Sequence, residues 1–130
     1  MALVVGDHHH HESAVRAVGT RRIGLAGHAA FETFSVLTRL PPPTRRTPAV
    51  VSHLLATNFP ESRFLSSEAA AALMARLGDG TIAGGSIYDA LVGAVAVEHR
   101  LVLVTRDRRA VDTYRAIGVD IELLSTTPPD

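Results

Sequence analysis

The stretch GGSIYDALVGAVAVEHRLVLVTRD, residues 84–107, decides the fold of this chain. A glycine turn is followed by an almost wholly apolar segment at residues 87–99 and by an apolar run at residues 101–104. The longer segment predicts a helix and the shorter run predicts a buried strand. A helix followed by a parallel strand is half of a βαβ unit, and ligands bind outside the carboxyl ends of such strands. Asp107 lies at such an end, and Asp89 lies in the first turn of the helix.

The rest of the chain alternates in the same way. Strand candidates are residues 23–26, 63–65 and 121–124, and helix candidates are residues 29–40, 48–58, 68–77 and 108–117. This alternation predicts an α/β fold with a mainly parallel sheet covered by helices on both faces. The apolar stripe predicted for the first of these helices consists of Ala30, Phe31, Phe34, Leu37 and Leu40. We expect a single domain over residues 1–130, with a flexible polar tail at residues 125–130.

Several helix starts carry residues that are typical of caps. Thr47 precedes a proline at the first helical position, and Ser67 can cap the alanine-rich helix. Ser86 and Asp89 have the spacing of a capping box. Asp107 can cap the helix that follows it. These structural roles compete with functional ones for both acids.

The composition limits the classes of partner. Thirteen acidic residues balance thirteen basic ones, all of them arginine, so a polyanion would have to bind to local patches. The chain has no cysteine, which excludes disulfides and Cys-ligated zinc. No apolar run approaches the roughly 20 residues of a membrane span. The expectation is a soluble cytoplasmic protein that does not enter a membrane.

Three acids, Glu32, Asp89 and Asp107, lie at the starts of helices that follow turns or strands. Each fits an ordinary structural role when it is considered alone. In a parallel sheet, however, these positions converge on one edge. Carboxylates gathered there repel one another, and a hard divalent cation with a preference for oxygen ligands relieves the repulsion. Mg²⁺ or Mn²⁺ held by carboxylates is suited to phosphodiester hydrolysis.

The segments at residues 27–41, 82–92 and 105–107 resemble PIN-domain ribonucleases of the VapC toxin type, from toxin–antitoxin modules. The resemblance covers nearly the whole chain in the order of its elements, and it implies a PIN-like three-layer fold. It implies that Glu32, Asp89 and Asp107 are metal-site carboxylates and that the Thr105 hydroxyl positions a water or ligand beside them. It also implies Mg²⁺- or Mn²⁺-dependent cleavage of RNA such as tRNA or rRNA, a homodimer, and inhibition by a cognate antitoxin.

The N-terminal segment departs from the family pattern, in which an Asp-Thr-Ser follows the first strand. The favoured expectation is that the first strand and its acid are missing, because Asp7 leaves little chain before the His-rich segment. The alternative is that residues 3–7 are the first strand and that Asp7 is its acid. Without this acid, the chain would be a catalytically impaired module that only binds antitoxin or RNA. A flavodoxin-like or receiver-like domain is a weaker alternative, because neither a phosphate loop nor an acid after the first strand is evident.

Two further groups of residues have open roles. His8–His11 could bind metal, but a solvated helix start, a chance run or an engineering remnant is favoured. Candidates for contacts with RNA phosphates are Arg39, Arg45, Arg46, Arg106, Arg108 and Arg109. Arg106 and Arg108 could pair with Asp107 instead. Arg45 and Arg46, which lie in a predicted loop, are expected to be solvated. The sequence shows no aromatic surface that would read bases.

Overall fold

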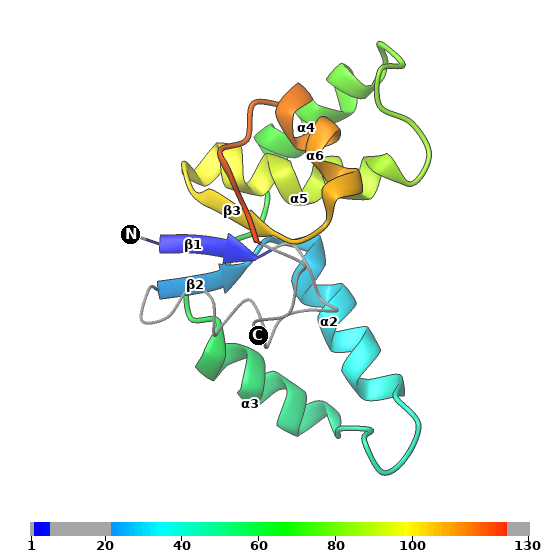
Figure 1. Ribbon diagram of the computed structural model, residues 1–130, viewed down its shortest axis with the longest axis vertical. Coiled ribbons are helices and arrows are strands. Elements are labelled where there is room, and N and C mark those ends of the chain that lie inside the picture. Colours follow the sequence, from blue (N-terminus) through cyan, green and yellow to red (C-terminus); the bar gives the residue numbers. More distant parts are fainter. Residues whose placement is uncertain (1, 6–21, 125–130) are drawn as a thin grey trace.

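A computed structural model describes residues 2–5 and 22–124 as an α/β fold with a parallel sheet between two layers of helices (Figure 1). The strands are β1 (Ala2–Val5), β2 (Arg22–Leu25), β3 (Val102–Thr105) and β4 (Ile121–Leu123). Their order in the sheet is β2-β1-β3-β4, and every pairing is parallel. The predicted α/β fold with a parallel sheet is therefore confirmed.

Helices cover both faces of the sheet (Figure 1). One layer contains α2 (His28–Arg39) and α3 (Pro48–Asn58), and the other contains α4 (Ser67–Leu77), α5 (Ser86–His99), the short 3₁₀ helix η1 (Arg108–Ala110) and α6 (Val111–Ala116). Neighbouring side chains of β3 divide between two core clusters: Leu103 packs with α5 and α6, and Val104 packs with Phe59. This alternation is the period-2 pattern of a strand that is buried on both faces.

The strand β1 is one of the two inner strands of the sheet, together with β3. Its residues pair with β2 on one side and with β3 on the other, with Val4 opposite both Gly24 and Leu103. The expectation that the first strand is missing is wrong, because β1 is present at Ala2–Val5. Whether Asp7 supplies the acid of this strand stays a prediction. Asp7, His8–His11 and the tail at residues 125–130 lie outside the described residues.

Some local predictions are confirmed. Thr47 caps α3 by accepting a hydrogen bond from the Val50 N–H at 3.3 Å. Asp107 caps η1 by accepting one from the Arg109 N–H at 3.0 Å. Short polar side chains satisfy free N–H groups at these starts, as the sequence pattern implies.

Other local predictions are wrong. Ser66, not Ser67, caps α4, and its hydroxyl accepts from the Ala69 N–H at 3.1 Å. The capping box at Ser86 is not formed, because α5 already includes Ser86 and follows Gly85 without a side-chain cap. The helix instead begins with two backbone turns, in which the Ile87 N–H donates to the Gly84 carbonyl and the Tyr88 N–H donates to the Gly85 carbonyl. No strand forms at residues 63–65, where the chain makes a single bridge to β2's end before it turns into α4.

The apolar stripe predicted for α2 is wrong at Phe31, whose side chain is 67% exposed. Ala29 and Thr33 are the buried residues of this helix. The Thr33 hydroxyl donates a hydrogen bond to the Ala29 carbonyl at 2.8 Å, so its polar group is satisfied inside the core. Small side chains one turn apart therefore face the sheet, and the phenylalanine faces solvent.

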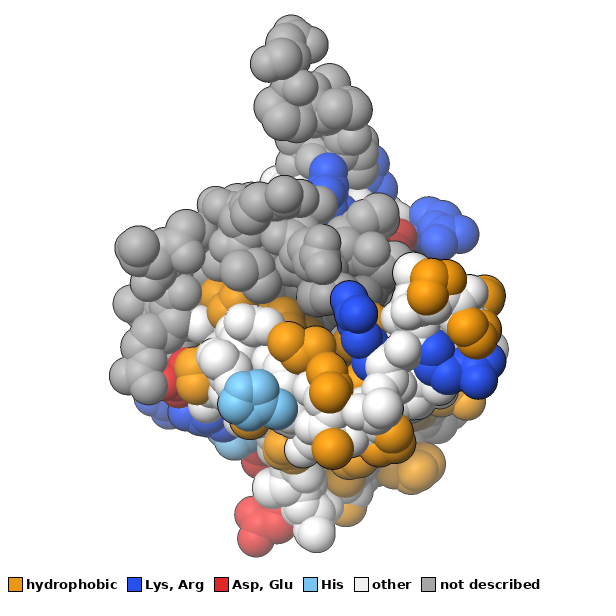
Figure 2. Space-filling view, turned by 90° about the horizontal axis from the view of Figure 1, so that it is seen from below, with side chains coloured by type: hydrophobic (Ala, Val, Ile, Leu, Met, Phe, Trp, Pro, Cys, Tyr) orange, Lys and Arg blue, Asp and Glu red, His pale blue; other side chains and the backbone are white. Residues whose placement is uncertain are grey.

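The outer surface of α3 is also partly apolar. Val51 is the buried residue of this helix, whereas Val50 beside it is 46% exposed. Seen from below, apolar side chains and arginine side chains share this end of the molecule (Figure 2). None of the helices within residues 22–124 is long and apolar enough to cross a membrane.

Candidate active site

The candidate site lies at the carboxyl edge of the sheet, where β2 and β3 end and α2 and α5 begin. The chain passes from β2 into α2 through Gly27, whose φ of 39° lies in the region that favours glycine. A Cβ on this residue would stand 3.0 Å from the Val95 side chain of α5. The start of α2 therefore packs closely against α5, and this brings the two helices that carry Glu32 and Asp89 together.

Glu32 lies one turn into α2 and contacts His28. The His28 Nε2 is 2.8 Å from the Glu32 Oε1, and both side chains are about one-third exposed, at 33% and 39%. The His28 ring also stacks on Tyr88 of α5, with ring centroids 5.0 Å apart and an interplanar angle of 23°. His28 thus joins Glu32 to the residue that precedes Asp89. Its role was missed in the sequence, because a ring contact between distant segments leaves no periodic pattern.

Asp107 lies two residues beyond β3, in a turn that Thr105 supports. The Thr105 hydroxyl is completely buried and accepts a hydrogen bond from the Asp107 N–H at 3.0 Å. The Asp107 carboxylate accepts the capping bond from the Arg109 N–H and lies 3.5 Å from the Arg109 Nε. Thr105 was predicted to position a water or ligand, and in the structure it holds the backbone that carries this acid. Arg109, not its predicted neighbours, is the arginine seen against the carboxylate.

Asp89 lies in the first turn of α5 and is partly buried, between exposed Tyr88 and fully buried Ala90. A carboxylate in a first helical turn is favoured by the helix dipole. The capping alternative for this acid is not realised, since α5 has no side-chain cap. What remains is an acid at the start of a core helix, next to the ring that stacks on His28.

The three predicted acids therefore come from elements that meet at one edge, but they are not assembled as a ligand set. In residues 2–5 and 22–124, no three His, Asp or Glu side chains are grouped as a metal site. The donor chemistry still fits a hard divalent cation, because all three candidates are carboxylates. Arg109, which contacts one of them, is 95% exposed and can move away without leaving a buried charge.

A surface hollow extends from the site along α2. Its volume is about 240 Å³, and it is lined by Glu32, Ser35, Val36 and Arg39. These residues are three or four positions apart, so they share one face of the helix. The hollow places the Arg39 guanidinium on the same helix face as the Glu32 carboxylate.

Comparison with known proteins agrees with this architecture. Residues 1–116 match the PIN domain family. The chain is 44% identical over 120 residues to Ribonuclease VapC40 of Mycobacterium tuberculosis (strain ATCC 25618 / H37Rv), and the match covers 91% of this chain and 88% of that protein. It is also 44% identical over 119 residues to Ribonuclease VapC27 of the same strain, with coverage of 92% and 87%. The chain therefore belongs to the PIN-domain family and is of the VapC type.

Proposed function

We propose that this chain is an endoribonuclease toxin that hydrolyses RNA phosphodiester bonds with Mg²⁺ or Mn²⁺ and is neutralised by a cognate antitoxin. The observation that carries the proposal is the convergence of α2, α5 and the end of β3, which bear Glu32, Asp89 and Asp107, on one edge of the sheet. Membership of the PIN-domain family and similarity to two proteins named as ribonucleases support it.

The carboxylates of Glu32, Asp89 and Asp107 would hold the cation. A cation bound there would supply a water of lowered pKa and would neutralise charge on the phosphate. Thr105 fixes the turn that carries Asp107, and its buried hydroxyl keeps that turn from shifting. Arg39, on the face of α2 that Glu32 shares, would bind a neighbouring phosphate. In the reaction water adds to phosphorus in line with the leaving ribose oxygen, the phosphorus–oxygen bond breaks, and the leaving oxygen takes a proton.

The substitution Asp89→Asn tests this assignment. It should lower metal-dependent cleavage of RNA by more than about a hundredfold, because even groups that only support metal ligands contribute about ten- to a hundredfold. The melting temperature should be retained, because asparagine keeps the shape of the side chain. The matched control is Asp112→Asn, at an exposed acid of α6, which should cleave like the unmodified chain. Retained cleavage in Asp89→Asn would rule the assignment out.

The impaired binding module is separated from the nuclease by a titration. Calorimetry with Mn²⁺ should show binding to the unmodified chain and much weaker binding to Asp89→Asn. A chain that binds its antitoxin or RNA but takes up no Mn²⁺ would be the binding module instead. The homodimer implied by the family resemblance is tested by light scattering of the purified chain.

A further inference from the structure

The sequence indicates no aromatic surface that would read bases, but the structure shows two ring pairs, His28 with Tyr88 and Phe31 with Phe64, which come from α2, the start of α5 and the segment before α4. We call these four residues the ring platform. Phe31, Phe64 and Tyr88 are 67%, 51% and 55% exposed. The centroids of the Phe31 and Phe64 rings are 5.9 Å apart, with an interplanar angle of 60°. The His28 ring stacks on Tyr88 as described above. A single exposed apolar residue is common, whereas grouped exposed apolar surface marks a binding site.

The ring platform borders the candidate acids. Phe31 immediately precedes Glu32, and Tyr88 immediately precedes Asp89. His28 lies three positions before Phe31 and four before Glu32, so its side chain neighbours each of them on the surface of α2. The ring platform therefore adjoins two of the three candidate acids, Glu32 through its contact with His28 and Asp89 through its chain neighbour Tyr88.

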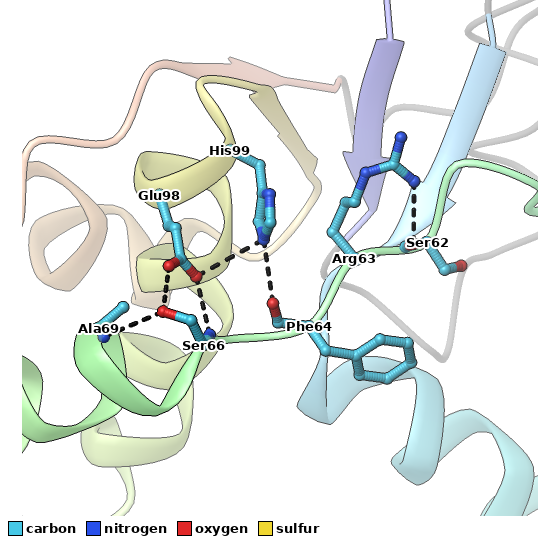
Figure 3. Close-up of polar contacts among 7 residues, drawn as sticks. All are labelled: Ser62, Arg63, Phe64, Ser66, Ala69, Glu98 and His99. Carbon is cyan, nitrogen blue, oxygen red and sulfur yellow. Dashed lines mark hydrogen bonds and ion pairs between the residues drawn. The ribbon is translucent and has the colours of Figure 1, made fainter.

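The segment that carries Phe64 is held in place by polar contacts (Figure 3). The Phe64 carbonyl oxygen lies 3.0 Å from the His99 Nε2. Two residues later, the Ser66 N–H donates a hydrogen bond of 2.9 Å to the Glu98 carboxylate. The Phe64 ring itself extends from this network toward α2. Because its backbone is fixed, the ring needs little ordering when a ligand stacks on it.

We propose that the ring platform stacks unpaired bases of the RNA strand that is cleaved beside it, an inference that rests on the proposed function. Aromatic side chains stack on every base, because each base has a π face, and this contact tolerates any sequence. Arg39, in the hollow that continues from Glu32, supplies the charge for the strand's phosphates. An apolar peptide would instead require apolar surroundings, whereas Glu32 and Asp89 border these rings. Bases paired inside a duplex are out of reach of the platform, so the contact requires unpaired bases.

The test measures RNA binding in the absence of cleavage. The probe is a fluorescein-labelled single-stranded oligoadenylate of about ten nucleotides, titrated by fluorescence anisotropy in EDTA. Phe31→Ala and Tyr88→Ala should each weaken binding by about tenfold. Phe31→Trp should bind at least as well as the unmodified chain, whereas Phe31→Leu should bind like Phe31→Ala. The control is Met74→Ala on α4, which removes a side chain of 73% exposure and should leave the affinity unchanged.

An abasic oligonucleotide of the same length identifies the contact as stacking. It should bind the unmodified chain more weakly, and Phe31→Ala should cause no further loss. An equal loss on both probes would overturn the proposal, as would unchanged affinity of the ring variants or undetectable binding by the unmodified chain. A change confined to the dimer mass or to the affinity for an antitoxin would assign the rings to a protein partner, and the proposal would again fail.

The outcome is separable from the fate of the nuclease assignment. Asp89→Asn should bind the oligoadenylate at least as tightly as the unmodified chain, because it keeps the rings and loses a negative charge near the phosphates. A chain that binds through its rings but does not cleave contradicts the nuclease assignment alone. A chain that cleaves while Phe31→Ala and Tyr88→Ala bind and cleave equally well contradicts the ring platform alone.

Discussion

At the scale of single residues, the carboxylate of Glu98 connects two segments that are distant in the sequence (Figure 3). It accepts hydrogen bonds from the hydroxyl and from the backbone N–H of Ser66, and Ser66 in turn caps α4. These hydrogen bonds, that of the hydroxyl foremost, hold the pKa of Glu98 below the usual glutamate value. The ionised carboxylate therefore stabilises the native chain by fixing the start of a helix.

This lowered pKa predicts a pH-dependent effect of Glu98→Gln. A carboxyl whose pKa is lower in the native state stabilises it above the unfolded-state pKa, and the contribution is lost as the pH falls through the native pKa. Glu98→Gln should therefore melt at a lower temperature than the unmodified chain at about pH 6, and the difference should shrink toward about pH 3. Melting curves by circular dichroism measure this difference. The control is Glu68→Gln, at an exposed glutamate of α4, and a difference for Glu98→Gln that does not vary with pH would contradict the account.

Residue-level prediction succeeded where a local rule applies and failed where a distant contact decides. The caps Thr47 and Asp107 were predictable, because a cap needs only its own turn. The exposure of Phe31 was not predictable from the sequence. Helical periodicity alone does not decide which face of α2 is buried, and here the face with the small side chains of Ala29 and Thr33 packs against the sheet. The acids were chosen as candidates for their places at the ends of elements, and whether they act as ligands stays a prediction.

At the scale of elements, the crossing of α5 and α6 depends on Gly93. A Cβ at this position would stand 2.6 Å from the Ile117 Cδ1, 3.0 Å from the Val119 Cγ2 and 3.1 Å from the Tyr114 Cδ1. The glycine lies inside a helix, where its backbone freedom is a disadvantage of about 1 kcal/mol relative to alanine. Its presence there is explained by the close approach of these side chains.

Gly93→Leu should lower the free energy of unfolding by about 2 kcal/mol, because a large side chain in this crossing forces its neighbours out of their packing. Urea denaturation followed by circular dichroism measures the loss. Val97→Leu, one turn further along α5 at a position with 44% exposure, is the control and should change stability little. Equal stability of the two variants would show that the crossing has room that the structure does not indicate.

Element types were more predictable than their ends. The long apolar run at residues 87–99 specifies a buried helix, and α5 occupies it. Its start was mispredicted because backbone turns at Gly84 and Gly85 replace the side-chain cap. The strand expected at residues 63–65 is reduced to one bridge, because Ser66 begins the cap of α4 immediately afterwards.

At the scale of the whole molecule, the carboxyl ends of short parallel strands share the edge of the sheet that carries the candidate site. The alternation of helices and strands was enough to predict a mainly parallel sheet, since parallel strands need helical crossovers. The inner place of β1 was not predictable from four apolar residues, because pairing with β2 and β3 is a long-range property. Because β1 is parallel to β2 and β3, its last residue, Val5, lies toward the same edge of the sheet as the carboxyl ends of those strands.

The convergence of acids on this edge predicts that the stability of the molecule depends on divalent cations. An ion that binds only the native state stabilises it by about 2.7 kcal/mol at a hundred times its dissociation constant. We therefore expect Mg²⁺ to raise the melting temperature and EDTA to reverse the rise. Mg²⁺ is the suitable probe because it prefers oxygen ligands, so His8–His11 do not compete for it.

Asp107→Asn isolates the carboxylates as the cause of this rise. Asparagine caps a helix as well as aspartate does, so η1 should keep its start while one ligand charge is lost. Without Mg²⁺ the variant should be at least as stable as the unmodified chain, because mutual repulsion of the acids is reduced. With Mg²⁺ its melting temperature should stay unchanged, while the control Asp112→Asn should show the full rise. If Mg²⁺ raises the melting temperature of Asp107→Asn as far as that of the unmodified chain, the ion binds elsewhere, and the edge of the sheet is not its site.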